Sequence, residues 1–273
     1  MPAYARPTDL GAALALRAAG YRVLAGGTDL YPAVGATLAG DILDITALPD
    51  LRGIDLADGL RIGAATPWTA IAEATLPPAL IALQQAARVV GGRQIQNAGT
   101  IGGNLCNASP AADGIPPLLV LDAAVELASA TGTRRIPLQT YLKGPRRVDL
   151  QPAELLTAIL IPPSALRGRS AFTKLGARSH LVISIAMVAV RLVTTAGRIT
   201  QARVAVGACS ATAQRLPLAE AALHGATQTD AAKLIRSEHL AALAPIDDIR
   251  ATATYRCEAA LELLRRTVTG ACR

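Results

Sequence analysis

Two glycine-rich segments constrain what this chain can fold into more than any other feature of its sequence. They are residues 24–30 (LAGGTDL) and 97–110 (NAGTIGGNLCNASP), and about 75 residues separate them. Neither is a Rossmann G-x-G-x-x-G fingerprint or a P-loop. Glycines nevertheless let consecutive backbone N–H groups approach an anion without a Cβ in the way. A single Gly-Gly pair is most often an ordinary tight turn, but two such loops suit a diphosphate held from both sides.

Polar side chains in and near these segments add to the expected anion site. Thr28 and Thr100 offer hydroxyl groups, and Asn104 offers an amide. A helix that begins after Thr28 would direct its positive end toward the same point. Downstream, Asp113 suits the hydroxyls of a ribose or ribityl chain, although a lone Asp is more commonly a helix cap or a solvated residue.

The composition predicts a globular chain with an aliphatic core. At about 150 residues per domain, 273 residues form one large domain or two modest ones. Hydrophobic residues make up 51% of the chain but aromatic residues only 3%, so Ala, Leu, Val and Ile must fill the core. Gly (23) and Pro (17) are too few for a collagen-like or disordered chain.

The cysteines argue against metal clusters and disulfides on this chain. Cys106, Cys209, Cys257 and Cys272 form no C-x-x-C motif, so neither a zinc ribbon nor a local iron–sulfur ligand set is expected. The N-terminus lacks an apolar signal-peptide region, and the longest apolar run, 181–190, is too short to span a bilayer. These features predict a soluble protein of a reducing compartment, the cytoplasm, with no membrane span.

The net charge of +7 raises the possibility of nucleic-acid binding. The basic residues are scattered, however, and aromatic residues do not alternate with them as a single-strand stacking platform requires. No recognition helix or basic stripe is visible either. We therefore expect an anionic ligand or an acidic protein partner rather than nucleic acid.

The hydrophobic pattern predicts two domains. The expected boundaries are 1–165, divided into subdomains of approximately 1–55 and 56–165, and 166–273, with the linker at 162–169. The long segment 91–117 is read as a functional loop, because structureless loops of this length are rarely mere connections. In the first domain the expected helices are 10–19, 70–75 and 80–90, and the expected strands are 21–25, 42–45, 54–56, 60–63, 124–128 and 134–137. In the second domain the expected strands are 171–176, 182–195 and 198–206, and the expected helices are 219–223, 231–243 and 249–267.

Taken together, the motifs resemble those of the FAD-binding subunit of the molybdenum hydroxylases, the xanthine dehydrogenase and carbon monoxide dehydrogenase family. The resemblance covers nearly the whole chain. The matching segments are 25–29 (AGGTD), 99–104 (GTIGGN), 107–113 (NASPAAD), 154–157 (ELLT) and 172–178 (FTKLGAR). The resemblance implies an α+β fold: a two-subdomain FAD-binding fold of the vanillyl-alcohol oxidase type, followed by a carbon monoxide dehydrogenase flavoprotein C-terminal-like domain.

The resemblance also implies which residues contact FAD, and it implies no catalytic residue and no metal ligand on this chain. The family often has an aromatic residue near position 90 for the adenine, where this chain has Val90. Cys106 is read either as a small hydrophobe packed beside the flavin or as a redox-active thiol. Lys174 is read either as a cofactor contact or as a surface lysine. The implied contacts are Leu24, Ala25, Gly26, Gly27, Thr28, Asp29, Thr100, Gly103, Asn104, Cys106, Asp113, Leu156 and Lys174.

By the same resemblance, the chain is the middle subunit of a heteromeric oxidoreductase. Electrons are expected from a small [2Fe–2S] subunit, with molybdopterin on a large subunit, and they leave FAD for NAD, oxygen or a quinone. The expected assembly is a dimer of heterotrimers. Two alternatives stay open: a stand-alone flavin-dependent oxidase or reductase of the same fold, and a non-catalytic nucleotide-binding scaffold.

Overall fold

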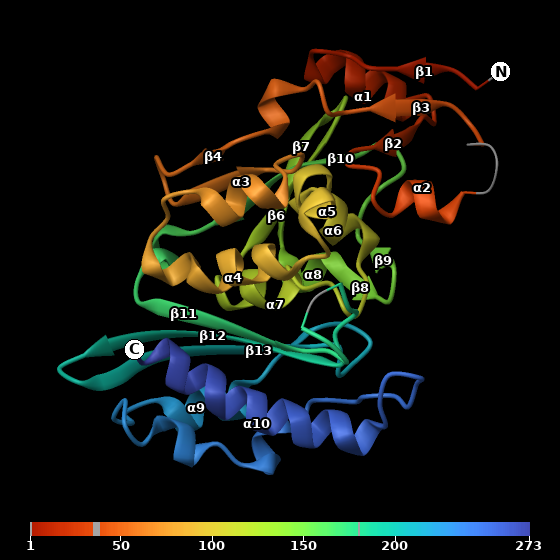
Figure 1. Ribbon diagram of the computed structural model, residues 1–273. Coiled ribbons are helices and arrows are strands. Elements are labelled where there is room, and N and C mark those ends of the chain that lie inside the picture. The colour runs from red at the N-terminus through yellow and green to blue at the C-terminus, as the bar shows by residue number, and fades with distance from the viewer. Residues whose placement is uncertain (1, 35–38, 180) are drawn as a thin grey trace.

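The computed structural model (Figure 1) describes residues 2–34, 39–179 and 181–273. The chain forms three larger sheets, one after the other along the sequence, with helices between and around them. The first sheet is parallel and is followed by an antiparallel five-stranded sheet and an antiparallel four-stranded sheet. Within the described ranges, every helix is too short or too polar to cross a lipid bilayer.

The first sheet positions the first glycine segment. The expected helix at 10–19 is confirmed as α1 (Leu10–Ala18), which the Asp9 carboxylate caps by accepting from the Ala12 N–H at 2.8 Å. Strand β2 ends at Leu24, so the glycine segment leaves the sheet at a strand end. In order across the sheet, the strands are β1 (Tyr4–Ala5), β3 (Ile42–Asp44) and β2 (Arg22–Leu24).

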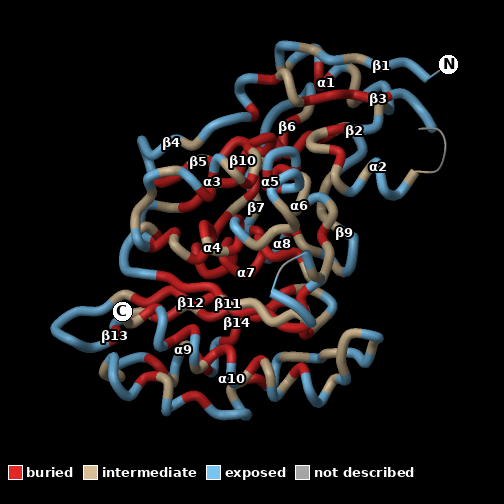
Figure 2. Tube along the Cα trace, in the orientation of Figure 1, coloured by how far each residue is buried: buried red, intermediate tan, exposed pale blue. Residues whose placement is uncertain are grey.

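The second sheet forms the centre of the molecule. The strands expected at 54–56 and 60–63 are confirmed as β4 and β5, which pair antiparallel. The central strand, β10, has no counterpart among the expected strands. Figure 2 shows buried positions concentrated on β5, β10 and the helices in front of them. In order across the sheet, the strands are β4 (Ile54–Asp55), β5 (Leu60–Gly63), β10 (Leu155–Ile161), β6 (Ala124–Ser129) and β7 (Gly132–Pro137).

The third sheet packs against the second through a shared core. Along β12, Met187 and Ala189 join the core formed with the second sheet, whereas Val188 and Val190 face the C-terminal helices. The helices α4 (Ile81–Val89) and α7 (Ile115–Val120) fill the space between the two sheets (Figure 1). On the outer face lie α9 (Pro217–Leu223) and α10 (Ala253–Ala271). The strands are β11 (Arg169–Leu175), β12 (Ala186–Thr195), β13 (Arg198–Gly207) and β14 (Gln214–Arg215).

The expectation of one long loop at 91–117 is wrong. The segment folds into α5 (Arg93–Ala98), α6 (Ile101–Asn107) and α7, joined by short turns. Thr100 caps α6 by accepting from the Gly103 N–H at 3.1 Å. The glycines lie inside the helix because it packs against backbone: a Cβ on Gly102 would stand 2.6 Å from the Ala64 carbonyl oxygen. Glycine therefore marks close packing here rather than a loop.

The expected helix at 231–243 is also wrong. Two 3-10 turns, Ala231–Leu234 and Ser237–Leu240, replace it. The Ile235 carbonyl between them accepts from the Arg265 guanidinium of α10 at 2.9 and 3.1 Å. The Arg265 side chain therefore occupies the Ile235 carbonyl oxygen, which in a continuous helix would accept a hydrogen bond from a backbone N–H of the next turn.

The expected linker at 162–169 is a tight connection with little freedom. It contains a 3-10 turn, Pro163–Leu166, and the Ala165 side chain in it is fully buried. The remaining elements are α2 (Leu30–Ala33), α3 (Trp68–Glu73), α8 (Leu138–Tyr141), β8 (Leu142–Gly144), β9 (Arg147–Val148) and 3-10 turns at Pro49–Leu51 and Pro78–Leu80.

Candidate cofactor-binding site

The expected cofactor residues gather around one cavity of about 750 Å³. Its volume lies within the range of small-molecule and cofactor sites. Leu24 is the exception: its side chain is buried and its carbonyl accepts from the Ile45 N–H at 3.0 Å within the first sheet. The expected residues that line the cavity are Ala25, Gly26, Gly27, Thr28, Asp29, Thr100, Gly103, Asn104, Cys106, Asp113, Leu156 and Lys174.

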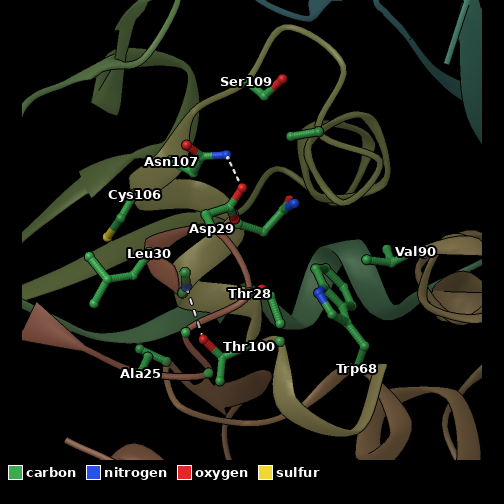
Figure 3. A pocket seen from close by; sticks show the side chains of 18 of the residues that line it. Ala25, Thr28, Asp29, Leu30, Trp68, Val90, Thr100, Cys106, Asn107 and Ser109 are labelled. Carbon is green, nitrogen blue, oxygen red and sulfur yellow. Dashed lines mark hydrogen bonds between the residues drawn. The ribbon is translucent and has the colours of Figure 1, made fainter. Parts of the chain in front are cut away.

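The two glycine segments touch each other in the cavity wall. A Cβ on Gly26 would stand 1.8 Å from the Ala98 carbonyl oxygen, and one on Gly99 would stand 3.3 Å from Thr28 Oγ1. Gly27 has φ +71°, a left-handed conformation that glycine adopts without steric cost. Figure 3 shows Thr28 and Thr100 beside each other where the segments meet. The loops therefore form one surface. In the second segment the amides of Ile101, Gly102 and Gly103 already donate to Thr66, Ala64 and Thr100, so the backbone amides that can face a ligand are those of the first segment.

A side-chain bridge ties the far ends of the same segments. The Asn107 amide donates to Asp29 Oδ1 at 3.1 Å (Figure 3), and the Arg146 guanidinium donates to Asn107 Oδ1 at 3.2 Å. Asp29 thus holds the loops together as well as lining the cavity. Sequence reasoning missed Arg146, because it belongs to the turn between β8 and β9 and carries no local motif.

One buried polar atom in the wall calls for a ligand partner. The Oδ1 atom of Asn104 has no hydrogen-bond partner among the described residues, although buried polar groups are almost always paired. Its amide can present either a donor or an acceptor to the cavity, since the two ends of the group are interchangeable by a flip. A hydroxyl or phosphate of a bound nucleotide would satisfy it.

Asp113 and Lys174 form a buried ion pair at one end of the cavity. The Lys174 Nζ lies 2.6 Å from Asp113 Oδ2, and the Ser184 hydroxyl donates to Asp113 Oδ1 at 2.7 Å. Burial raises the pKa of Asp113, and the charge of Lys174 with both hydrogen bonds acts in the opposite direction. Sequence reasoning missed Ser184, which precedes strand β12.

Position 90 lies beside the ion pair of Asp113 and Lys174. Lys174 Nζ also lies 3.5 Å from the Val89 carbonyl oxygen, so Val90 lies at the same end of the cavity as Asp113. Asp113 and Val90 therefore face the same part of a ligand in the cavity. The aromatic side chain that the structure brings to this end is Trp68, which is buried in the wall and missed by sequence reasoning.

The cavity is elongated, with apolar surface at both ends. In Figure 3, Trp68 and Val90 lie at one end, Leu30 and Cys106 lie toward the other, and Thr28 lies between them. Ile45 and Leu156 add further apolar surface to the cavity wall. This layout suits two ring systems joined by a charged centre, the architecture of a dinucleotide.

Cys106 is an exposed residue in the cavity wall. Its Sγ lies 3.5 Å from the hydroxyl of Tyr141, which is fully buried. Protein surrounds the thiol on the sides away from the cavity, and this burial raises its pKa. A raised pKa reduces the thiolate fraction, so the structure favours the packed thiol over the redox-active one.

Cys106 should therefore react slowly with iodoacetamide. At pH 7.5 we expect alkylation at least about tenfold slower than that of glutathione, because only the thiolate reacts. The rate should rise as the pH increases past 9. Peptide mass spectrometry of timed samples measures it, with the urea-unfolded chain as the control. Labelling of Cys106 as fast as glutathione at neutral pH would show an activated thiol.

No metal site is present among the residues that the structure describes: no three His, Cys, Asp or Glu side chains come close enough to share an ion.

Comparison with protein families decides the relationship. Residues 1–164 match the family described as FAD binding domain in molybdopterin dehydrogenase, and residues 153–271 match the CO dehydrogenase flavoprotein C-terminal domain. The chain belongs to the FAD-binding medium subunits of the molybdenum hydroxylases. The expected fold, an FAD-binding domain followed by the C-terminal domain, is thereby confirmed.

Individual relatives of this medium subunit match over almost their full lengths. The xanthine dehydrogenase FAD-binding subunit of Escherichia coli O157:H7 is 32% identical, over 92% of this chain and 88% of that protein. The carbon monoxide dehydrogenase medium chain of Afipia carboxidovorans is 33% identical, over 97% and 94%. The reconstituted CO dehydrogenase structure from Oligotropha carboxidovorans superposes with a TM-score of 0.87 at 31% identity, over 100% of this chain and 98% of that one.

Proposed function

We propose that this medium subunit binds FAD in the cavity and relays electrons from a small [2Fe–2S] subunit to NAD, oxygen or a quinone. A large molybdopterin subunit would oxidise the substrate, and the complex would assemble as a dimer of heterotrimers. The observation that supports the proposal best is the contact between the two glycine segments in the middle of one elongated cavity.

The residues of the cavity fit FAD. The backbone amides around Gly26 and the hydroxyl of Thr100, all in the cavity wall, would face the diphosphate. Asn104, with its buried polar atom, would bond a phosphate or a hydroxyl of the cofactor. The Arg146 guanidinium at the rim adds positive charge near the same place.

The position of the Asp113–Lys174 ion pair indicates which end of the cofactor lies at which end of the cavity. We place the isoalloxazine at the end with Asp113, Lys174 and Val90, and the adenine toward the opposite end, beside Leu30 and Cys106. The Cys106 thiol would then pack beside the adenine rather than the flavin. FAD, once bound, supplies the redox chemistry; the protein positions it, tunes it and excludes water. Lys174 would place a cation beside the polar edge of the ring, where negative charge develops on reduction. Asp113 holds that ammonium group in place and accepts from the ribityl hydroxyls.

Reconstitution tests the proposal. The purified chain, incubated with FAD and desalted, should retain one flavin per chain, measured by its visible absorbance. Substrate should bleach that absorbance only after the small and large subunits are added, because the chain has no substrate-oxidising centre of its own. Bleaching by the isolated chain would indicate a stand-alone oxidase, and no retained flavin would indicate a scaffold. Analytical ultracentrifugation of the complex would test the dimer of heterotrimers.

A further inference from the structure

The C-terminal domain controls both oxygens of the Asp113 carboxylate. Lys174, on β11, holds Oδ2 at 2.6 Å, and Ser184, just before β12, holds Oδ1 at 2.7 Å. Asp113 itself lies between α6 and α7, in the FAD-binding domain. Ser184 is completely buried, so its hydroxyl has no water to exchange for this bond. The direction of the carboxylate thus depends on where the C-terminal domain places these two donors.

Two arginines fix the backbone at Ser184. Arg250 donates to the Ser184 carbonyl oxygen at 3.0 Å, and Arg256 donates to the Ile185 carbonyl oxygen at 2.7 Å. Asp248 binds both guanidinium groups, at 2.5 Å and 2.6 Å, respectively. We call Asp248, Arg250 and Arg256 the Asp248 brace. Its bonds are charge-assisted, which makes them stronger and more directional than neutral ones.

The brace lies outside the site that it influences. None of its three residues is among the described residues that line the cavity. The Arg256 side chain is 1% exposed, so the brace is built into the C-terminal domain and is not a mobile surface contact. Arg250 and Arg256 connect Asp248 to the backbone at Ser184 and Ile185, and Arg256 also donates to the Ala208 carbonyl oxygen at 3.0 Å. Asp248 therefore acts on a ligand in the cavity only indirectly, through the backbone that these arginines hold.

We propose that Ser184 is a positioning residue for the cofactor, and that the Asp248 brace sets the orientation of Asp113 through it. This inference rests on the proposed function, because FAD is the ligand whose ribityl hydroxyl Asp113 would accept. It assigns to the C-terminal domain a direct part in cofactor affinity. The C-terminal domain would then contribute to cofactor binding as well as to the packing of the core.

Removal of the Ser184 hydroxyl should weaken FAD binding about tenfold, the size of one hydrogen bond to a charged group. Asp248→Asn should have a similar effect. The double variant should lose less affinity than the sum of the two single losses, because both changes act through Ser184. Ser184→Cys, with a weaker donor of similar size, should fall between wild type and Ser184→Ala. Fluorescence titration with FAD measures the dissociation constants of wild type and of the four variants, after circular dichroism confirms that each is folded.

Ser170→Ala is the matched control. Ser170 is also buried, and its Oγ accepts from the Ala82 N–H at 2.8 Å, but it does not line the cavity. The variant should lose thermal stability and keep the wild-type affinity for FAD. A purely structural role for Ser184 predicts that the two serine variants behave alike.

The pH dependence of FAD affinity separates positioning from stability. Lys174 is the charged group in contact with Asp113, and Ser184 is its other donor. Both lower the pKa of Asp113 against the effect of burial. Without the Ser184 bond, Asp113 becomes protonated at higher pH and stops accepting from the hydroxyl. In Ser184→Ala, the acid-side loss of affinity should therefore begin at a higher pH than in wild type.

Three results would overturn the inference while wild type binds FAD: unchanged affinity in Ser184→Ala, equal behaviour of Ser184→Ala and Ser170→Ala, or additive losses in the double variant. Failure of wild type itself to bind FAD would overturn the proposed function and this inference together.

Discussion

Gly26→Ala should abolish tight FAD binding. The added Cβ would stand 1.8 Å from the Ala98 carbonyl oxygen and 2.9 Å from the Gly99 Cα, so the two glycine segments must separate. Both contacts are with backbone, which cannot swing aside as a side chain can. Overpacking of this kind costs about 1–3 kcal/mol of stability. Because the same displacement opens the proposed diphosphate cradle, we expect FAD affinity to fall about a hundredfold, measured by fluorescence titration.

Gly270→Ala is the control for this substitution. Gly270 lies near the end of α10, and its Cβ would meet only the Ala171 Cβ at 3.4 Å, an ordinary contact. Alanine also favours a helix more than glycine does. This variant should keep or slightly raise the melting temperature and bind FAD as wild type does. Equal FAD affinity in Gly26→Ala and Gly270→Ala would show that the glycine contact does not form the cofactor site.

Lys174→Met should destabilise the protein strongly and impair FAD binding. It leaves the buried Asp113 carboxylate without its cation, and removing one partner of a buried pair typically costs about 3–5 kcal/mol. The loss should depend on pH. Lys174 lowers the pKa of Asp113, so in its absence the folded-state pKa rises further above the unfolded value. Protonation then relieves the buried charge, and the deficit should shrink as the pH falls from 8 to 5. Urea unfolding across that range measures it.

Two further variants define what the ion pair does. Lys174→Met/Asp113→Leu should recover most of the lost stability, because no unpaired charge remains, but it should not recover FAD affinity. Arg93→Met breaks the Arg93–Glu73 pair, whose side chains are each 62% exposed, and should cost less than about 1 kcal/mol. If Lys174→Met costs no more than Arg93→Met at pH 8, the pair is not buried in solution as the structure has it.

The sequence predicted those helices and strands that are determined by residues close to them in the chain. The helix at Leu10–Ala18 follows a capping Asp9, and the β12–β13 hairpin turns at residues 195–197 as its glycine indicates. Strand β10 was missed because nearly all its side chains are buried, so its apolar run shows no alternation. The helices of 91–117 were missed because their glycines serve close packing against Ala64, which only the tertiary structure reveals.

In the candidate site, too, the residues within local motifs could be predicted and the isolated residues could not. The glycine segments were readable from the sequence because a ligand that approaches backbone requires glycine in consecutive positions. Trp68, Arg146 and Ser184 were not readable, because each is an isolated residue with no motif around it. Ser184, for example, contacts Asp113 from 71 residues further along the chain. Arg250 of the Asp248 brace contacts Ser184 from another 66 residues further along. Such contacts are set by how the sheets pack.

A paired titration with FAD and FMN tests the central claim most directly: that one cavity holds a whole dinucleotide, with its diphosphate between the glycine segments. FMN carries the same isoalloxazine but lacks the adenine end and one phosphate. We expect one FAD per chain, with FMN bound at least about a hundredfold more weakly, because FMN leaves the end with Leu30 and Cys106 without contacts. Equal affinity for FMN and FAD, or no binding of either, would contradict it.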